Sequence, residues 1–314
     1  MSRYYLGIDI GGTAVKLGLV RSNGEITNSG TYSVNFDHYK TPIIDTVLKS
    51  LESFIHENTI DLSTIKGIGV SATGQIDVHN GIVAGTAGHI NNWVGTPLKD
   101  ILQETYHLPV LVENDANCAV IGEHWLGDAA NYSNVVMLTI GTGVGGGIII
   151  NNHLLSGQMG IAGELGHFPL NAHGKPCYCG NIGCYEQYAS TTALVADVKE
   201  TLNNDPHINL EKINGKYIFT QLQKGNPTIS VIVEQWIDNI ARGIVGLIHI
   251  FNPEAIIIGG GVSQQEELFI SPLREKILEL TMPCFKKNLI ITKASLGNNA
   301  GLCGAVYPFI KNNS

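Results

Sequence analysis

The sequence predicts an α/β protein built from two domains. The chain has 314 residues, which is more than one hydrophobic core usually holds. β-rich runs alternate with helical patterns, and a strand, a glycine turn and a second strand occur twice, at residues 4–19 and 135–150. We expect one domain at 1–118 plus 300–314 and a larger one at 119–299. Ligands bind preferentially in clefts between domains, so the site is expected there.

The first domain is expected to begin with a β-hairpin around a Gly-Gly-Thr turn. The helix that opens at Pro42 carries its apolar residues on one face, and the following strand is apolar enough to be buried. The last strand runs directly into Glu113-Asn114-Asp115-Ala116-Asn117. The predicted elements are strands at residues 4–10, 15–19, 65–70 and 108–112, a helix at 42–55, and a helix that ends near His124.

The second domain repeats the hairpin pattern and adds a long helix. Strand 135–140 is followed by an expected glycine loop at 141–147 and a second strand at 148–150. Apolar residues at helical spacing predict a helix over about 229–250, which Asn252-Pro253 ends. The predicted elements that remain are a buried strand at 255–258 before three glycines, and a short final helix after the Gly- and Asn-rich segment 296–304.

Composition excludes several partners. The net charge is −8 and no run of Lys and Arg occurs, so a nucleic-acid or anionic membrane surface is not expected as the main partner. The sequence has no apolar signal region and no apolar stretch of membrane-spanning length. We therefore expect a soluble, cytoplasmic protein. Cys118, Cys284 and Cys303 are scattered singly, which predicts reduced, buried thiols.

Residues 163–186 contain the densest group of metal-binding side chains. His167, Cys177, Cys179 and Cys184 supply one imidazole and three sulfurs, the donor set of a closed tetrahedral zinc site. Such a zinc ion would be structural, because no position is left for substrate. A folded zinc loop would hold the neighbouring Glu164 and Glu186 rigidly at the edge of a pocket.

Two alternatives to this zinc site stay open. The three cysteines can instead form one disulfide and one free thiol, although Cys177 and Cys179 are only two residues apart. His173 is a competing ligand, although Gly174 and Pro176 beside it favour a turn residue that faces solvent.

The glycine loops predict a nucleotide site. Residues 141–146 match the G-x-G-x-x-G pattern of dinucleotide-binding proteins, but residues 148–150 are too short to be the helix which that fingerprint requires. A glycine hairpin turn can instead present backbone N–H groups to phosphates. Two such turns, with a third glycine cluster at 259–261, favour a phosphate-binding role over ordinary hairpins.

Two acidic residues have candidate roles beside these turns. Asp115 follows a strand at the predicted domain boundary and could accept a proton from a substrate hydroxyl; the simpler interpretation is a helix N-cap. Asp9 precedes the first glycine turn and could hold waters around Mg²⁺; the simpler interpretation is a polar strand end.

Taken together, these motifs resemble the ROK (repressor, open reading frame, kinase) family. The resemblance rests on Asp9-Ile10-Gly11-Gly12-Thr13, on residues 113–117, on the glycine segment 141–147, and on Gly163-Glu164-Leu165-Gly166-His167 with the three cysteines. It covers nearly the whole chain. It implies the hexokinase-like, actin-like ATPase fold, which is also ribonuclease H-like, with two α/β domains that close on a sugar and ATP.

The resemblance also implies roles for individual residues. Asp115 is similar to the base that takes the proton from a sugar hydroxyl during phosphoryl transfer from ATP. The residues similar to sugar contacts are Asn114, Asp115, Glu164, His167 and Glu186. Those expected at ATP and its Mg²⁺ are Asp9, Gly11, Gly12, Thr13, Gly141, Thr142, Gly143, Gly145, Gly146, Gly147, Gly259, Gly260 and Gly261. Family members are often homodimers, so a homodimer is expected.

Substrate identity stays open at this stage. Many family glucokinases have a proline in the loop where this chain has Ala72-Thr73-Gly74-Gln75, and an asparagine where it has His89. Glucose, N-acetylmannosamine and β-glucosides are all candidate substrates, with transfer to the 6-hydroxyl. The alternatives to a kinase are a sugar-sensing regulator and a sugar-binding protein without catalysis. A regulator is disfavoured because only eight residues precede Asp9, where family repressors carry a DNA-binding domain.

Overall fold

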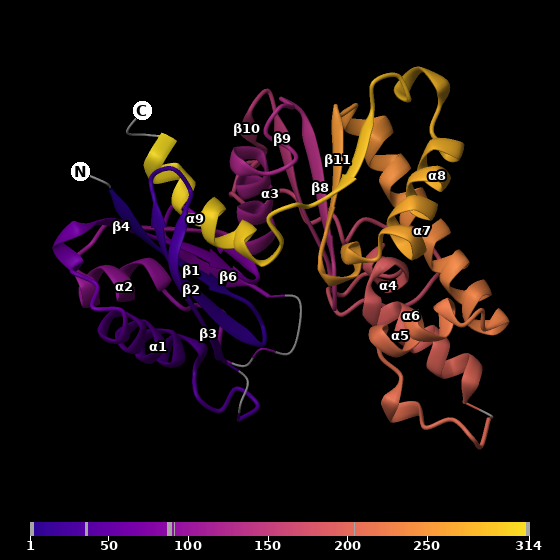
Figure 1. Cartoon of the computed structure of the whole chain (residues 1–314), viewed down its shortest axis with the longest axis horizontal. Coiled ribbons are helices and arrows are strands. Elements are labelled where there is room, and N and C mark those ends of the chain that lie inside the picture. Colours follow the sequence, from indigo (N-terminus) through magenta and orange to yellow (C-terminus); the bar gives the residue numbers. More distant parts are fainter. Residues whose placement is uncertain (1–2, 35–36, 87–89, 91, 204, 312–314) are drawn as a thin grey trace. The chain divides into compact units, whose positions relative to one another are not determined.

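The computed structural model describes residues 3–34, 37–86, 90, 92–203 and 205–311, which form two compact units (Figure 1). Unit 1 consists of Met1–Asn131, His153–Gly163 and Leu296–Ser314. Unit 2 consists of Tyr132–Asn152 and Glu164–Ser295. The division assigns residues 119–131, 153–163 and 296–299 to unit 1, whereas the sequence pattern placed them in the larger domain. Residues 119–126 complete α3, which packs against the C-terminal helix of the same unit.

The core of unit 1 is a five-stranded mixed sheet of order β3-β2-β1-β4-β7. β1 pairs with β2 in antiparallel and with β4 in parallel orientation, and β4 pairs with β7 in parallel orientation. The strands are β1 (Tyr4–Ile10), β2 (Ala14–Arg21), β3 (Ile26–Ser33), β4 (Ile65–Ala72) and β7 (Val110–Asn114), while β5 (Gln75–Asp77) and β6 (Ile82–Gly85) form a separate antiparallel pair.

In the described part of unit 1, four helices have nine residues or more. They are α1 (Ile43–Glu57), α2 (Leu98–Tyr106), α3 (Asp115–Leu126) and α9 (Ala300–Lys311). Ile43, Val47, Leu51 and Phe54 of α1 share one helix face and are buried in the same core as the side chains of β1 and β4. α9 packs against β1, β4 and α3. The amphipathic helix expected from Pro42 is confirmed, with Pro42 as its N-cap residue.

Glycines allow α9 to approach its neighbours closely. A Cβ atom on Gly304 of α9 would lie 1.8 Å from the backbone oxygen of Cys118 in α3. A Cβ on Gly69 of β4 would lie 2.2 Å from the backbone oxygen of Ala305. Backbone atoms cannot turn aside as a flexible side chain can, so these positions require glycine.

Replacing Gly304 with alanine is therefore expected to destabilise the protein by about 1–3 kcal/mol, the usual cost of overpacking. The matched control is Gly246→Ala in the long helix of unit 2, where an added Cβ would meet no atom within 4 Å. Alanine should stabilise that helix by about 0.5–1 kcal/mol. Thermal unfolding followed by circular dichroism measures both, and a Gly304→Ala midpoint at or above that of Gly246→Ala would contradict this packing.

Unit 2 repeats the central strand arrangement of unit 1. Its strands follow the order β9-β8-β11-β12, in which β8 pairs with β9 in antiparallel and β11 pairs with β8 and β12 in parallel orientation. The same hairpin-plus-parallel pattern is formed by β2, β1, β4 and β7. The strands are β8 (Val135–Ile140), β9 (Val144–Ile150), β11 (Ala255–Gly259) and β12 (Ile290–Lys293), and the short β10 (His153–Leu154) follows β9 in sequence.

The helices of unit 2 are α4 (Glu186–Ala189), α5 (Thr191–Leu202), α6 (Gly215–Gln223), α7 (Pro227–Phe251) and α8 (Ser271–Leu280). Among them α7 confirms the long helix expected near 229–250, and Asn252 ends it in the left-handed conformation. Single turns of 3₁₀ or π helix occur in both units, at Leu62–Thr64, Leu210–Lys212, Gly261–Gln264, Glu266–Ile270, Pro283–Phe285 and Gly297–Asn299. Within the described ranges, no helix combines the length and apolarity that crossing a membrane requires.

Two local expectations were wrong. The glycine loop does not extend to residue 147, because β9 begins at Val144 and Gly145, Gly146 and Gly147 pair with β8. A Cβ on Gly146 would lie 2.4 Å from the Leu165 side chain, so this glycine permits close packing of a strand. Cys284 is exposed and not buried, since it lies in the turn Pro283–Phe285 after α8. Cys118 and Cys303 are buried, as expected.

Candidate active site and metal centre

In unit 1 the candidate residues gather where three parallel strands end. Ile10, Ala72 and Asn114 are in register across β1, β4 and β7. The glycine turn after β1, the loop after β4 and Asp115 after β7 therefore lie along one edge of the sheet. In open α/β sheets, ligands bind outside the carboxyl ends of such strands.

Asn114 fixes the start of α3 and the neighbouring loop. Its side-chain oxygen accepts hydrogen bonds from the backbone N–H groups of Ala116 (2.9 Å) and Asn117 (3.1 Å). Its amide donates to the backbone oxygen of Gly74 at 2.9 Å and to the Asp115 carboxylate at 3.1 Å. The helix N-cap is thus Asn114 and not Asp115. This leaves Asp115 as the first helical residue, with its carboxylate oriented by Asn114.

Asp115 and Glu113 lie in different environments. One carboxylate oxygen of Asp115 accepts the backbone N–H of Ala116 at 2.9 Å, and its side chain is partly exposed. Glu113 accepts hydrogen bonds from the Asn114 N–H and the Asn117 amide, while burial raises the pKa of its carboxyl group above the usual range. Of these two acids, Asp115 is the one placed at the positive end of a helix dipole.

Asp9 and the first glycine turn lie at the end of β1. Asp9 forms an ion pair with Lys16 (3.2 Å) and accepts a hydrogen bond from the Ser71 hydroxyl at 2.7 Å. In the turn, the Gly11 N–H donates to the Ala14 oxygen at 2.9 Å, and the Tyr39 hydroxyl donates to the Gly12 oxygen. The turn expected between two strands is confirmed.

In unit 2 the second glycine turn, Gly141–Gly143, is tied down at both ends. The Gly141 N–H donates to the Gly143 oxygen at 2.9 Å. The Gly141 oxygen accepts from the Thr191 N–H at 2.8 Å and from the Thr191 hydroxyl at 2.5 Å. At the other end, the Val144 N–H donates to a Glu186 carboxylate oxygen at 2.8 Å. The turn therefore depends on both ends of the segment 186–191.

The third glycine cluster lies next to this turn. β11 and β8 are parallel and Gly259 pairs with Thr139, so both strands end at the same edge. Gly260 has a φ angle of +89°, and a Cβ on it would lie 2.1 Å from the Ile140 oxygen. Only glycine suits this combination of dihedral angle and close approach. The structure thus brings Gly141–Gly143 and Gly259–Gly261 together within unit 2.

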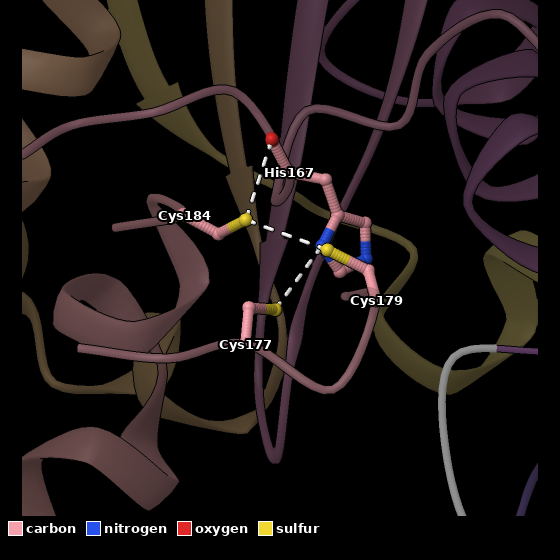
Figure 2. Close-up of side chains that lie close together, drawn as sticks. All are labelled: His167, Cys177, Cys179 and Cys184. Carbon is pink, nitrogen blue, oxygen red and sulfur yellow. Dashed lines mark hydrogen bonds between the residues drawn. The ribbon is translucent and has the colours of Figure 1, made fainter. Parts of the chain in front are cut away.

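The predicted metal ligands also come together in unit 2 (Figure 2). One donor atom each from His167, Cys177, Cys179 and Cys184 lies within 4.8 Å of all the others. The Cys179 and Cys184 sulfurs are 3.5 Å apart, and the Cys177 sulfur is 3.7 Å from His167 Nδ1. A tetrahedral zinc ion with Zn–S bonds of about 2.3 Å would place its ligands about 3.8 Å apart. The donor set and its spacing therefore fit zinc.

Neither alternative to this ligand set agrees with the structure. The cysteine sulfurs are too far apart for a disulfide, and all three cysteines are free. His173 is exposed and is not part of the group that can hold a metal ion. Burial raises the pKa of the Cys184 thiol to about 12, so metal binding there would have to release a proton.

Glu164 and Glu186 flank this metal cluster differently. Glu164 Oε2 is 4.0 Å from His167 Nε2, the ring nitrogen that faces away from the Cys177 sulfur. Glu186 is buried, and its second carboxylate oxygen accepts a hydrogen bond from the Tyr178 hydroxyl. Burial and this hydrogen bond raise the pKa of the Tyr178 phenol, which keeps it a donor.

The contact between Glu186 and the glycine turn leads to a testable prediction. A Cβ on Gly143 would lie 2.4 Å from the Glu186 carboxylate, whereas a Cβ on Gly141 would meet no atom within 4 Å. Gly143→Ala should push Glu186 away from the Val144 N–H and speed hydrogen exchange of that amide about tenfold, the effect of one lost hydrogen bond to a charged group. Gly141→Ala is the matched control, and equal exchange in both variants would contradict the contact.

The sequence motifs did not identify every residue of these two sites. Ser71 and Thr191 hold Asp9 and Gly141 through hydrogen bonds between residues at least 50 apart in sequence. Tyr178 holds Glu186, eight residues further along the same segment. In the sequence, the one feature that pointed to Tyr178 was its position between the expected ligands Cys177 and Cys179. His89, expected to bear on substrate choice, lies outside the described residues.

Comparison with known proteins places the chain in a family. The ROK family profile matches residues 5–312. The glucokinase of Thermotoga maritima is 35% identical over 96% of this chain and 95% of its own length. The xylose repressor of Caldicellulosiruptor bescii is 31% identical over 96% of this chain and 76% of its own length.

A solved structure gives the fold. The ROK family glucokinase from Streptomyces griseus in complex with glucose and AMPPNP superposes with a TM-score of 0.85, at 32% identity, covering 97% of this chain and 98% of the other. The expected α/β class is confirmed, and the fold is the hexokinase-like, actin-like ATPase fold. With the family profile matched over almost its entire length, this chain belongs to the ROK family.

Proposed function

We propose that the protein is an ATP-dependent carbohydrate kinase that transfers the γ-phosphoryl group of ATP to the 6-hydroxyl of a hexose or hexosyl sugar. The observation that carries the proposal is the placement of Asp115. Its carboxylate follows β7 at the same sheet edge as the first glycine turn, and Asn114 orients it. The relation to a glucokinase solved with glucose and an ATP analogue supports the same assignment.

Asp115 would act as the base in this reaction. It accepts the proton of the 6-hydroxyl while that oxygen forms a bond to the γ-phosphorus and the bond from phosphorus to the β–γ bridging oxygen breaks. Asn114 keeps the carboxylate in place and holds the loop at Gly74. Phosphoryl transfer depends mainly on alignment and charge neutralisation, so this fixed placement matters more than a high proton affinity.

The glycine turns are the proposed nucleotide site. Gly12 and Thr13 in unit 1 and Thr142 and Gly143 in unit 2 would offer backbone N–H groups to the phosphates. The N–H groups of Gly11 and Gly141 instead donate within their own turns, which shapes the two turns. Gly259–Gly261 would receive the adenosine, beside the second turn. ATP supplies the phosphoryl group when bound, and Mg²⁺ neutralises the phosphate charge. Asp9 would hold the waters of that Mg²⁺, near the Lys16 ammonium with which it pairs.

The metal cluster has a structural role in this proposal. His167, Cys177, Cys179 and Cys184 would hold Zn²⁺, and the folded loop would present Glu164 and His167 to the hydroxyls of the sugar. Glu186, also expected at the sugar, is buried and accepts hydrogen bonds from protein donors at both carboxylate oxygens. His167 can serve both purposes, because one ring nitrogen faces the Cys177 sulfur and the other faces Glu164. The homodimer and the cytoplasmic location expected from the sequence stay predictions.

A coupled assay of ATP consumption over a sugar panel tests the proposal. The panel contains glucose, N-acetylmannosamine, N-acetylglucosamine, fructose and cellobiose, and ³¹P NMR identifies the position of the new phosphate. We expect turnover with at least one of these sugars and a 6-phosphate product. Sugar binding without ATP consumption across the panel would overturn the kinase assignment and favour a sugar-responsive regulator.

A further inference from the structure

Tyr178 connects the metal cluster to the second glycine turn. It lies between the ligands Cys177 and Cys179, so the metal loop fixes its backbone on both sides. Its ring packs edge-on against the ring of His167, with centroids 5.9 Å apart and an interplanar angle of 83°. The position of the Tyr178 hydroxyl is therefore determined by three metal ligands: Cys177 and Cys179 beside it in sequence, and His167 against its ring.

The Tyr178 hydroxyl donates to one carboxylate oxygen of Glu186, and the other oxygen of Glu186 accepts the Val144 N–H at 2.8 Å. Glu186 is 6% exposed, so its carboxylate depends on these protein donors in place of water. Val144 is the residue that closes the turn Gly141–Gly143 and begins β9. A continuous chain of contacts thus runs from the metal ligands through Tyr178 and Glu186 to the turn.

We propose that Tyr178 is a positioning residue that makes the geometry of the Gly141–Gly143 turn, and hence nucleotide binding, depend on the metal centre. This inference rests on the proposed function for its nucleotide part. A metal ion that orders the loop would set the Tyr178 hydroxyl, which holds Glu186 in reach of the Val144 N–H. Without the hydroxyl, Glu186 loses the donor that fixes one carboxylate oxygen, so the hydrogen bond from the Val144 N–H to its other oxygen should open more often.

Thr191 limits the size of the effect. Its N–H and its hydroxyl both donate to the Gly141 oxygen, at the opposite end of the turn from Val144. Losing the hydroxyl of Tyr178 should therefore loosen the turn without unfolding it. An effect of about fivefold on nucleotide affinity is expected, less than the roughly tenfold that a lost hydrogen bond to a charged group gives, because Thr191 still holds the turn.

Tyr178→Phe tests the proposal because it removes only the hydroxyl. Tyr188→Phe is the matched control: the Tyr188 hydroxyl accepts the Lys175 N–H at 2.7 Å in the same segment. For both variants and the unaltered protein we would measure bound zinc, the dissociation constant of a nonhydrolysable ATP analogue, and hydrogen exchange of the Val144 amide. Tyr178→Phe should retain zinc, bind the analogue about fivefold more weakly and exchange Val144 about fivefold faster. Tyr188→Phe should change neither the dissociation constant of the analogue nor the Val144 exchange rate by more than about twofold.

Chelation adds a second comparison. Removing the metal from the unaltered protein should weaken analogue binding and speed Val144 exchange, whereas removing it from Tyr178→Phe should add little, because the connecting contact is already lost. Zinc-loaded Tyr178→Phe with affinity and exchange equal to those of Tyr188→Phe would overturn the proposal. Were the unaltered protein to bind no ATP analogue, the proposed function would fail, and the Val144 exchange rates would still decide whether Tyr178 positions the turn.

Discussion

Replacing Asp115 with alanine is expected to lower turnover about a hundredfold or more, the usual scale for losing a positioned base. The variant should still fold, because the N-cap of α3 is Asn114 and not Asp115. The side-chain oxygen of Asn114 accepts hydrogen bonds from the backbone N–H groups of Ala116 and Asn117. Binding of the ATP analogue should also be retained, since the proposed phosphate contacts are backbone groups of the glycine turns. The loss should therefore appear in kcat.

The matched control is Asp100→Ala. Asp100 is also an acid in the first turn of a unit 1 helix, and it is exposed. Both variants lose a carboxylate near a helix N-terminus, so a stability effect of the helix dipole is common to both. Steady-state kinetics with saturating sugar should show the large loss only for Asp115→Ala. Near-normal turnover in a folded Asp115→Ala variant would remove this residue from the mechanism.

Replacing Cys184 with serine is expected to abolish stoichiometric metal binding and to weaken sugar binding about tenfold or more, the range found when metal-site support is lost. Cys184 is fully buried, and its sulfur lies 3.5 Å both from Cys179 Sγ and from the His167 backbone oxygen. A serine oxygen is a poor substitute for a zinc thiolate. Without the metal, the His167 ring is no longer held in place, and Glu164, which lies beside that ring, loses this support.

Cys284→Ser provides the control, because Cys284 is exposed and outside the metal cluster. Elemental analysis should find about one zinc per chain in the unaltered protein and in Cys284→Ser, and little in Cys184→Ser. Calorimetric titration with the best sugar of the panel measures the affinity. Equal sugar affinity in Cys184→Ser and Cys284→Ser would show that the metal centre does not support the sugar site.

Much of the two sites could be predicted from the sequence because their residues are close together in it. The three cysteines and His167 lie within one short segment, so their spacing alone suggested the cluster that the structure forms. Asn114 and Asp115 directly follow an apolar strand, which placed them at a sheet edge. The glycine turn at Gly11 lies between two strongly patterned strands, and the structure has the same hairpin.

What the sequence did not reveal depends on contacts between distant segments. Gly145, Gly146 and Gly147 resembled a loop because glycine is rare inside strands, yet at Gly146 packing against Leu165 requires a small residue. The contact of Val144 with Glu186 joins residues 42 positions apart, and no local pattern records it. Substrate identity depends on side chains around the sugar, which the family motifs leave undetermined.

The most direct test of the central claim is a crystal structure of the protein with a nonhydrolysable ATP analogue and its best sugar substrate. We predict that the sugar 6-hydroxyl lies about 3 Å from the Asp115 carboxylate, with the γ-phosphorus on the opposite side of that oxygen and the phosphates against the two glycine turns. A nucleotide bound away from both turns, or a sugar with no hydroxyl in reach of Asp115, would contradict the account.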